Sequence, residues 1–445
     1  MDMHGSWATS AFGHWGVVNN MEGQLPKNWA TRFFTIFTGQ AFSLFGSSLV
    51  QFALIWYLTQ KTGSATVLAT ASLFAMLPQI LLGPIAGTVV DRGSRRMIMI
   101  ASDSLIAVFT LLLAYLFWSG KVETWHIFLI SAVRSAGGAF HYPAMASSTS
   151  LMVPKEQLAR VAGANQMLQG LISIVAPPVG ALLIAVLPTQ NILMIDIATA
   201  LLGITPLLFI AIPQPKEHHD DAPKASFMQD LVGGFKYMAA WPGLLMLGLM
   251  ATLLNFLLAP TSALTPLLVT KYFGKGALEL GSLDSFFGVG MIAGGITLGV
   301  WGGFKKRIVT SLVGIFSFSF AVLAIAAAPA DKFWIMVVSM AVIGFMMPMA
   351  NGPIQALFQM LVEPNMQGRV MSLVGSVAQA MMPISLLIAG PVTDATSYQT
   401  WFWVAGVSTL LIAVGGFFVP AIFNIEENHH KNVAKTEAMS GTTGS

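Results

Sequence analysis

The sequence predicts an all-α integral membrane protein with twelve transmembrane helices in two pseudo-symmetric six-helix bundles. Three observations predict this fold: an apolar composition, twelve apolar stretches of spanning length, and one long hydrophilic break halfway along the chain. Apolar residues make up 55 % of the chain, charged residues only 9 %, and the mean hydropathy is +0.72. Soluble domains carry about 25 % charged residues. We therefore expect the lipid bilayer to be the solvent.

The twelve predicted spans are found by their length. A helix needs about 20 apolar residues to cross the hydrocarbon core. The spans cover residues 33–59, 66–90, 97–118, 124–146, 161–187, 190–212, 243–270, 281–303, 308–328, 333–361, 368–392 and 399–424. Short polar segments such as KTGSAT, SGKVET and APADK separate neighbouring spans.

The longest hydrophilic break, PQPKEHHDDAPKASFMQD at 213–230, falls between the sixth and seventh spans. It divides the chain into a first bundle at 29–212, a cytoplasmic linker at 213–237 and a second bundle at 238–425. We expect residues 1–28 to be a poorly ordered cytoplasmic extension and residues 426–445 a flexible cytoplasmic tail. The start of the chain has no basic segment followed by an apolar core, so it is a poor signal peptide.

Lysine and arginine predict the orientation in the membrane. An even number of spans places both termini on one side, and the segments on that side hold sixteen Lys and Arg residues. The segments on the other side hold five, and Arg134 lies within a span. Because cytoplasmic loops are enriched in Lys and Arg, we expect a multi-pass plasma-membrane protein with both termini cytoplasmic.

Two pairs of similar segments suggest that the halves arose by duplication. GPIAGTVVDRGSRR (83–96) has a counterpart in GITLGVWGGFKKR (295–307), and VPKEQLARVAG (153–163) has one in VEPNMQGRVMS (362–372). The pairs occur in the same order, at the same spans of each half. Parallel repeats of this kind are one known transporter architecture.

The loop after the second span combines small and charged residues. This segment, called the gate loop below, comprises Gly83, Gly87, Asp91, Arg92, Gly93, Arg95 and Arg96. Gly83 and Gly87 share one helix face, where small residues allow another helix to approach closely. An aspartate such as Asp91 can sit at the positive N-terminus of a facing helix. Alternatively, the arginines only anchor the loop to anionic headgroups.

The gate loop resembles the signature loop G-x-x-x-D-R-x-G-R-R of the major facilitator superfamily. The resemblance implies that it joins the two halves on the cytoplasmic face when the carrier opens outward, with Asp91 at the eleventh span near Gly368. RSAGGAF (134–140) resembles the fourth-helix motif of that family. Residues Ala176, Pro177 and Gly180 of APPVG resemble the antiporter motif G-P-x-x-G, with alanine replacing its first glycine. Over most of its length the chain resembles bacterial macrolide-efflux permeases of the Mef type.

Three ionisable residues lie well inside spans, where they are costly and mark functional sites. They are Arg134 in the fourth span, Asp103 in the third and Asp196 in the sixth. Burial and an opposing charge move a carboxyl pKa in opposite directions, so a site with both can exchange a proton near neutral pH. We interpret the three as the proton-coupling set; otherwise each aspartate reaches the nearer surface and pairs there. Asp284 and Asp394 lie at span ends, where solvation is expected.

Polar amides within spans are candidate substrate contacts, because a drug pocket is mostly apolar with a few polar groups. The candidates are Gln40, Gln51, Asn165, Gln166, Gln169, Asn255, Asn351, Gln355, Gln359 and Gln379. Each of them can equally well hydrogen-bond between helices.

Other classes of function lack support in the sequence. There is no cysteine, no Walker A segment for ATP and no assembled catalytic set. His126, His141, His218 and His219 have neither the spacing nor the neighbouring carboxylates of a metal site. We expect no enzyme activity, no metal or other cofactor, and no nucleic-acid partner.

We therefore expect a secondary efflux transporter that works by alternating access, as a monomer, and exchanges an amphipathic small molecule for protons. The resemblance implies a bulky drug, specifically a macrolide. Two alternatives stay open: export of another solute such as a siderophore, and a lipid flippase or scramblase without proton coupling.

Overall fold

The computed structural model describes residues 28–214 and 227–427, and these residues form helices and connecting loops without a strand. Three predicted segments fall partly outside the described residues. Residues 1–27 of the extension at 1–28, residues 215–226 of the linker at 213–237 and residues 428–445 of the tail at 426–445 are not described.

Twelve long helices make up the fold, six in each half. The first half contains α1 (Trp29–Thr62), α2 (Ala65–Arg92), α3 (Arg95–Trp118), α4 (Thr124–Met152), α5 (Leu158–Val186) and α6 (Thr189–Phe209). The second half contains α8 (Pro242–Leu267), α9 (Ala277–Trp301), α10 (Arg307–Ala327), α11 (Phe333–Leu361), α12 (Pro364–Ala395) and α13 (Thr400–Phe418). The twelve-helix prediction is confirmed, and several helices extend beyond the apolar stretches that located them.

Helix α4 differs from the others in composition. Eleven long helices are apolar enough to cross a membrane by length and hydropathy, and Thr124–Met152 is not among them. It carries Arg134, His126 and His141 and ends in a run of small polar residues. It packs against α2 and α3. Polar groups of a spanning helix are tolerated where they face protein instead of lipid.

Four short elements accompany the long helices in the described residues. Residues Lys155–Gln157 form one 3-10 turn before α5, and Leu268–Tyr272 continue α8 as a π-helix. Helix α7 (Phe227–Ala239) precedes α8, and α14 (Pro420–Phe423) follows α13. Helix α7 packs on α12 closely enough that a Cβ at Gly234 would lie 2.8 Å from the Arg369 carbonyl oxygen.

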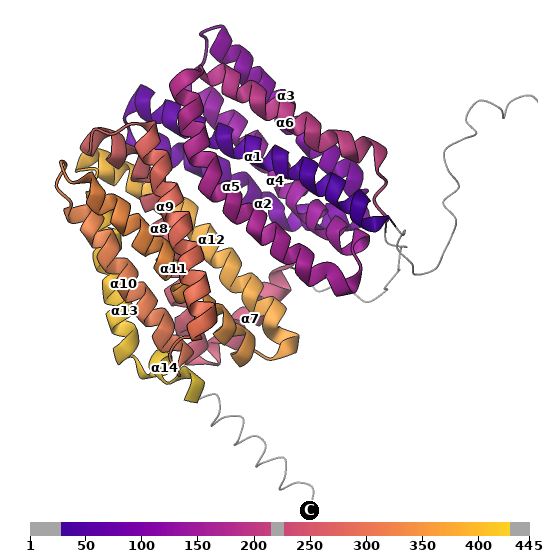
Figure 1. Cartoon of the computed structure of the whole chain (residues 1–445). Coiled ribbons are helices and arrows are strands. Elements are labelled where there is room, and N and C mark those ends of the chain that lie inside the picture. Colours follow the sequence, from indigo (N-terminus) through magenta and orange to yellow (C-terminus); the bar gives the residue numbers. More distant parts are fainter. Residues whose placement is uncertain (1–27, 215–226, 428–445) are drawn as a thin grey trace, which may run out of the picture.

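The two halves repeat one set of helix contacts. Within the first half, α1 meets α5 and α6, α2 meets α4, and α3 meets α4 and α6. Adding seven to each helix number gives the corresponding contacts of the second half: α8 with α12 and α13, α9 with α11, and α10 with α11 and α13. Figure 1 shows the indigo-to-magenta half beside the orange-to-yellow half. The predicted pseudo-symmetry is therefore present in the fold.

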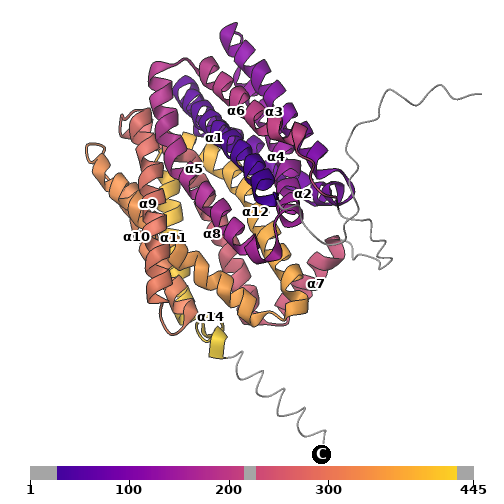
Figure 2. The same cartoon turned by 45° about the vertical axis from the view of Figure 1, so that its right-hand side comes forward.

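The main contacts between the halves are two equivalent helix pairs, α2 with α12 and α5 with α9 (Figure 2), and α8 also meets α1 and α2. We call the face where α1 begins and α13 ends the terminus side, and the opposite face the far side. Both pairs make their closest approach toward the far side. A Cβ at Gly390 would lie 2.8 Å from Thr66 Cα, and one at Gly281 would lie 2.8 Å from the Pro177 carbonyl oxygen.

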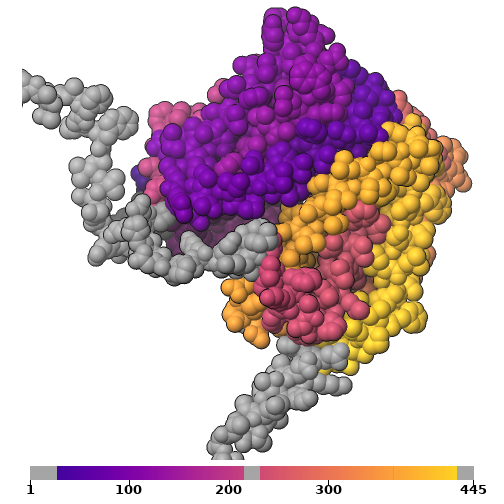
Figure 3. Space-filling model, turned by 180° about the vertical axis from the view of Figure 1, so that it is seen from behind, coloured from indigo at the N-terminus to yellow at the C-terminus, as the bar shows by residue number. Residues whose placement is uncertain are grey.

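On the terminus side the same helices are apart. Glycines in the terminus-side portions of α2, α5, α9 and α12 have no atom within 4 Å of an added Cβ. They are Gly83, Gly87, Gly163, Gly170, Gly295, Gly299, Gly368 and Gly375. The space-filling view shows the halves in contact at one end and diverging toward the other (Figure 3). The structure is thus closed on the far side and open on the terminus side.

Asp394, at the end of α12, joins the halves on the far side. Its carboxylate accepts hydrogen bonds from Ala65 N at 2.7 Å, Thr66 N at 2.9 Å and Ser64 Oγ at 2.8 Å. The Ala65 and Thr66 N–H groups belong to the first turn of α2, where they have no partner within the helix and a negative charge is favourable. The expected solvation of Asp394 is therefore incomplete, because one helix end caps another across the two halves.

Replacing Asp394 with alanine should favour opening of the far side. Losing charge-assisted hydrogen bonds at a partly exposed site costs about 1–2 kcal/mol, or roughly five- to thirtyfold in the equilibrium. The chain has no cysteine, so spin labels at Lys121→Cys and Ala330→Cys, both in far-side loops, report the distance between halves. We expect Asp394→Ala to populate longer distances.

The matched control is Asp331→Ala, which removes an exposed far-side carboxylate that caps no helix. It should leave the distance distribution unchanged. Equal distributions for the Asp394→Ala variant and the parent would contradict the capping role.

Candidate functional site

Four helices of the first half, α1, α3, α4 and α6, place polar groups at two common levels. On each helix the levels are seven residues apart, about two turns, so both groups lie on one face. The far layer consists of Ser47, Thr110, Arg134 and Asp196. The near layer consists of Gln40, Asp103, His141 and the Gly203 carbonyl oxygen. The near layer is closer to the terminus side, because Gln40 precedes Ser47 on α1.

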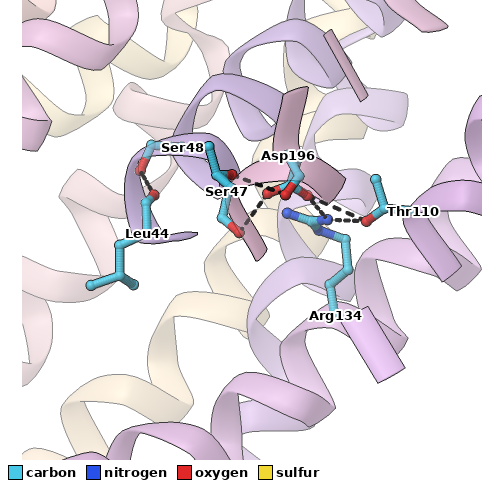
Figure 4. A network of polar contacts seen from close by, with 7 residues as sticks. Leu44, Ser47, Ser48, Thr110, Arg134 and Asp196 are labelled. Carbon is cyan, nitrogen blue, oxygen red and sulfur yellow. Dashed lines mark hydrogen bonds and ion pairs between the residues drawn. The ribbon is translucent and has the colours of Figure 1, made fainter. Parts of the chain in front are cut away.

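The far layer is centred on a buried ion pair (Figure 4). The Arg134 guanidinium lies 2.6 Å from Asp196 Oδ2, and the two side chains are 13 % and 2 % exposed. Asp196 also accepts hydrogen bonds from Ser47 Oγ at 3.1 Å and Thr110 Oγ1 at 3.4 Å. Arg134 donates a further hydrogen bond to Thr110. The layer is electrically neutral and its hydrogen bonds come from three helices besides α4.

The near layer holds a carboxylate without a full charge partner. Asp103 Oδ2 accepts a hydrogen bond from Gln40 Nε2 at 3.0 Å, and the same amide lies 3.2 Å from the Gly203 carbonyl oxygen. His141 Nε2 lies 3.4 Å from Asp103 Oδ1, within ion-pair distance but without the alignment of a hydrogen bond. Gln40, Asp103 and His141 are all buried.

Glycines allow these helices to approach closely enough for the layers to form. A Cβ at Gly46 would lie 2.0 Å from Thr199 Oγ1 and 3.2 Å from the Cα of Asp196. A Cβ at Gly203 would lie 3.4 Å from Gln40 Nε2. Small residues at helix interfaces bring polar groups of neighbouring helices within hydrogen-bonding distance.

Two adjoining cavities surround the near layer. The first, of about 190 Å³, is lined by groups of both layers, including Asp103, Arg134 and His141. The second, of about 500 Å³, runs between α1, α4 and α5 to their terminus-side ends, where Phe33 and Leu158 line it. Gln40, Leu44, His141 and Tyr142 line both cavities.

The predicted substrate contacts divide into two groups. Gln40, Gln51, Asn165 and Gln169 line one or both cavities. The remaining six are exposed on their helices and line neither cavity: Gln166, Asn255, Asn351, Gln355, Gln359 and Gln379. Asn255 hydrogen-bonds its own helix at the Ala251 carbonyl oxygen, 2.9 Å away. Substrate contact by any of them stays a prediction.

The gate loop is shorter than its charge cluster suggests. Arg92 ends α2 and Arg95 begins α3, so only two residues, Gly93 and Ser94, lie between the helices. Arg96 donates to the Leu207 and Leu208 carbonyl oxygens at the end of α6, and Arg95 bonds Gln214 Oε1 at 3.0 Å.

These arginine contacts stay within the first half of the chain. Asp91 is exposed, and within the described residues it has no recorded hydrogen bond or ion pair. The predicted contact with the start of α12 is thus not made in this terminus-side-open structure, and it stays a prediction for the opposite state.

The antiporter-like segment lies where the halves touch. Ala176 is buried, and Gly180 faces Phe52 of α1, since an added Cβ would lie 3.0 Å from that ring. The Pro177 carbonyl oxygen faces Gly281 of α9. Nearby, Ser285 Oγ donates to the Ile174 carbonyl oxygen at 2.9 Å, a hydrogen bond between the halves.

Sequence reasoning located both buried carboxylates and Arg134 but missed His141 as a partner. The sequence singles out His141 only as a possible metal ligand, and in the described chain no group of three His, Asp or Glu side chains could hold a metal ion. The available signal was spacing: Arg134 and His141 are seven residues apart, as are Asp103 and Thr110. Equal spacing on two adjacent helices indicates paired polar levels.

Two related six-helix halves, closed on one face and open on the other around buried charges, define a multi-pass membrane transporter. The family model of the Major Facilitator Superfamily matches residues 36–265 and 244–443. The chain belongs to the Major Facilitator Superfamily.

Curated relatives match nearly the whole chain. Macrolide efflux protein A of Streptococcus pyogenes is 36 % identical over 388 residues, covering 87 % of this chain and 96 % of the relative. The multidrug efflux pump Tap of Mycolicibacterium fortuitum is 25 % identical over 395 residues, covering 86 % and 94 %.

A solved structure supports the fold. The crystal structure of a POT family transporter in complex with 5-aminolevulinic acid matches with a TM-score of 0.66 at 12 % identity. The match covers 89 % of this chain and 96 % of the other. At this identity the likeness concerns the fold alone.

Proposed function

We propose that this protein exports a bulky amphipathic drug, a macrolide, in exchange for protons by alternating access. One observation carries the proposal. Arg134, which is paired with the buried Asp196, and the buried Asp103 line a cavity of the first half that adjoins one open to the terminus side. Ionisable groups inside a membrane protein are costly, and they are retained where ions or protons pass.

The proposal places the terminus side in the cytoplasm. The sixteen-to-five distribution of Lys and Arg supports this orientation. The structure then corresponds to the state that takes up cargo from the cytoplasm. Release on the outside requires the terminus side to close and the far side, including the Asp394 contact, to open.

The larger cavity suits an amphipathic cargo. Its volume of about 500 Å³ lies within the range of about 300–1,000 Å³ for small-molecule sites. Phe33, Phe37 and Tyr142 supply aromatic walls, and Asn165 and Gln169 supply polar contacts. The relatives named as a macrolide efflux protein and a multidrug pump support the drug class.

The test is transport by the purified chain in proteoliposomes with an imposed pH gradient. Vesicles that are acidic inside should accumulate radiolabelled erythromycin faster than vesicles without a gradient. A protonophore should abolish the difference, because an antiporter uses only the gradient. Erythromycin is a weak base that an acidic lumen traps unaided, so protein-free vesicles with the same gradient provide the baseline.

Each alternative gives a different result. A siderophore exporter would accumulate a labelled catechol siderophore and ignore erythromycin. A scramblase would move a fluorescent lipid without any gradient. Accumulation of erythromycin equal to the protein-free baseline would refute the proposed cargo and coupling.

A further inference from the structure

The near layer has a charge imbalance that the far layer lacks. Arg134 and Asp196 cancel each other at 2.6 Å. With a neutral imidazole, Asp103 has, among the residues that the structure describes, only the Gln40 amide as a hydrogen-bond donor and no positive partner. A buried carboxylate without a counter-charge is expensive. The near layer is therefore a site for one positive charge.

His141 is placed to carry that charge. Its Nε2 is buried without a hydrogen bond and lies 3.4 Å from Asp103 Oδ1. A deprotonated Nε2 would point a lone pair toward a carboxylate oxygen, whereas a protonated one would donate to it. Histidine is the side chain whose ordinary charge change falls between pH 5 and 8.

Few other ionisable groups surround His141. Asp103 faces it from α3, Asp196 lies one layer away on α6, and α4 itself contributes Arg134 and the neighbouring Tyr142. Helices α1, α2 and α5 carry charged side chains only within four residues of their ends. The balance of charge at the near layer is thus set by Asp103 and the protonation of His141.

We propose that His141 and Asp103 form a one-proton site that exchanges its proton with the terminus-side cavity when cargo binds. His141 Nε2 holds the proton against the Asp103 carboxylate, and the adjoining 500 Å³ cavity gives it a route to the terminus side. This inference rests on the proposed function, and it identifies the proton carrier of the predicted coupling set. The Arg134–Asp196 pair positions α3, α4 and α6 around that site.

A cargo that carries one positive charge would compete with this proton. His141, Gln40 and Tyr142 line both cavities, so an ammonium group in the larger cavity can approach Asp103. Two positive charges beside one carboxylate repel each other, so entry of the cation releases the proton from His141. The net charge of the near layer is unchanged if one proton is released for each monovalent cation that binds.

The first test measures proton release by the purified full-length chain in detergent. Erythromycin is added to lightly buffered samples that contain a pH-indicator dye. We expect about one proton released per chain where His141 is protonated, and an apparent affinity that rises roughly tenfold for each unit of increase in pH until His141 is deprotonated. His141→Gln, which keeps a hydrogen-bonding side chain, should release no proton and bind with a flat pH profile.

The matched control is His126→Gln on the same helix. His126 lies at the far-side end of α4, where its Nδ1 accepts a hydrogen bond from Glu123 N at 2.9 Å. This variant should retain the parent's proton release and pH profile. Size-exclusion elution and the thermal midpoint establish that each variant is folded. Undiminished proton release from folded His141→Gln would overturn the proposal.

A second measurement needs no cargo. The chain is labelled with ¹³C-histidine, and the NMR signal of His141 is assigned by its loss in His141→Gln. The chemical shift of this signal is then followed from pH 5 to pH 8. We expect His141 to titrate in this range, with a midpoint that changes in Asp103→Asn. A His141 signal that does not titrate would refute the one-proton site, even if erythromycin transport is driven by the gradient. Titration without gradient-driven transport would instead refute only the proposed function.

Discussion

Arg134→Leu should abolish transport and destabilise the folded chain by roughly 3–5 kcal/mol. The change leaves the Asp196 carboxylate, whose side chain is 2 % exposed, without its counter-charge. The Ser47 and Thr110 hydroxyl groups can donate hydrogen bonds but supply no positive charge. Erythromycin uptake in acid-inside proteoliposomes measures the first effect, and the thermal midpoint in detergent measures the second.

The double variant Arg134→Leu/Asp196→Leu separates folding from transport. Removing both charges also removes the unpaired buried group, so most of the lost stability should return. Transport should stay absent, because the far layer no longer holds α3, α4 and α6 by polar contacts. Arg160→Leu is the control, since Arg160 is exposed and its guanidinium donates a hydrogen bond to Gln157 Oε1 at 3.3 Å, its one partner in the described part of the chain. Normal transport by Arg134→Leu would show that the ion pair has no part in the cycle.

Much of the fold could be predicted from composition and length alone. Span length and hydropathy locate helices well in a bilayer, because every backbone polar group must be satisfied within the helix. Helix α4 was recovered although its composition is too polar for the hydropathy criterion, since Arg134 and the polar run at 147–150 interrupt only parts of it. The sequence does not predict helix α7, because its first residues, 227–230, belong to the hydrophilic break.

The site was predictable in its residues and not in its arrangement. A buried charge can be recognised in a sequence as an ionisable residue within an apolar segment. This criterion identifies Asp103, Arg134 and Asp196. Which carboxylate pairs with which base depends on helix rotation and crossing, and these follow from packing. Capping of α2 by Asp394 joins residues more than 300 positions apart, and no local pattern indicates such a contact.

Glycines on the two sides of the inter-half contact predict opposite conformational defects. A Cβ at Gly281 would lie 2.8 Å from the Pro177 carbonyl oxygen and 3.0 Å from Pro178 Cα, both backbone atoms that cannot turn away. Gly281→Val should therefore force α5 and α9 apart and open the far side. Gly87, in contrast, has no atom within 4 Å of an added Cβ. Gly87→Leu should leave this conformation intact and prevent α2 from meeting α12 on the terminus side.

Both substitutions should lower erythromycin transport roughly tenfold or more, because overpacking a close contact costs about 1–3 kcal/mol in one state only. Spin-label distances distinguish them. Gly281→Val should lengthen the far-side distance between Lys121→Cys and Ala330→Cys, whereas Gly87→Leu should hold the terminus-side distance between Glu156→Cys and Lys305→Cys at its longest values. Gly415→Ala, in α13, which belongs to neither inter-half helix pair, has no atom within 4 Å of an added Cβ and is the control for changing a glycine alone. Closure of the terminus side in Gly87→Leu would show that α2 and α12 do not approach each other there. The transport cycle would then not be the symmetric rocking that the two equivalent helix pairs imply.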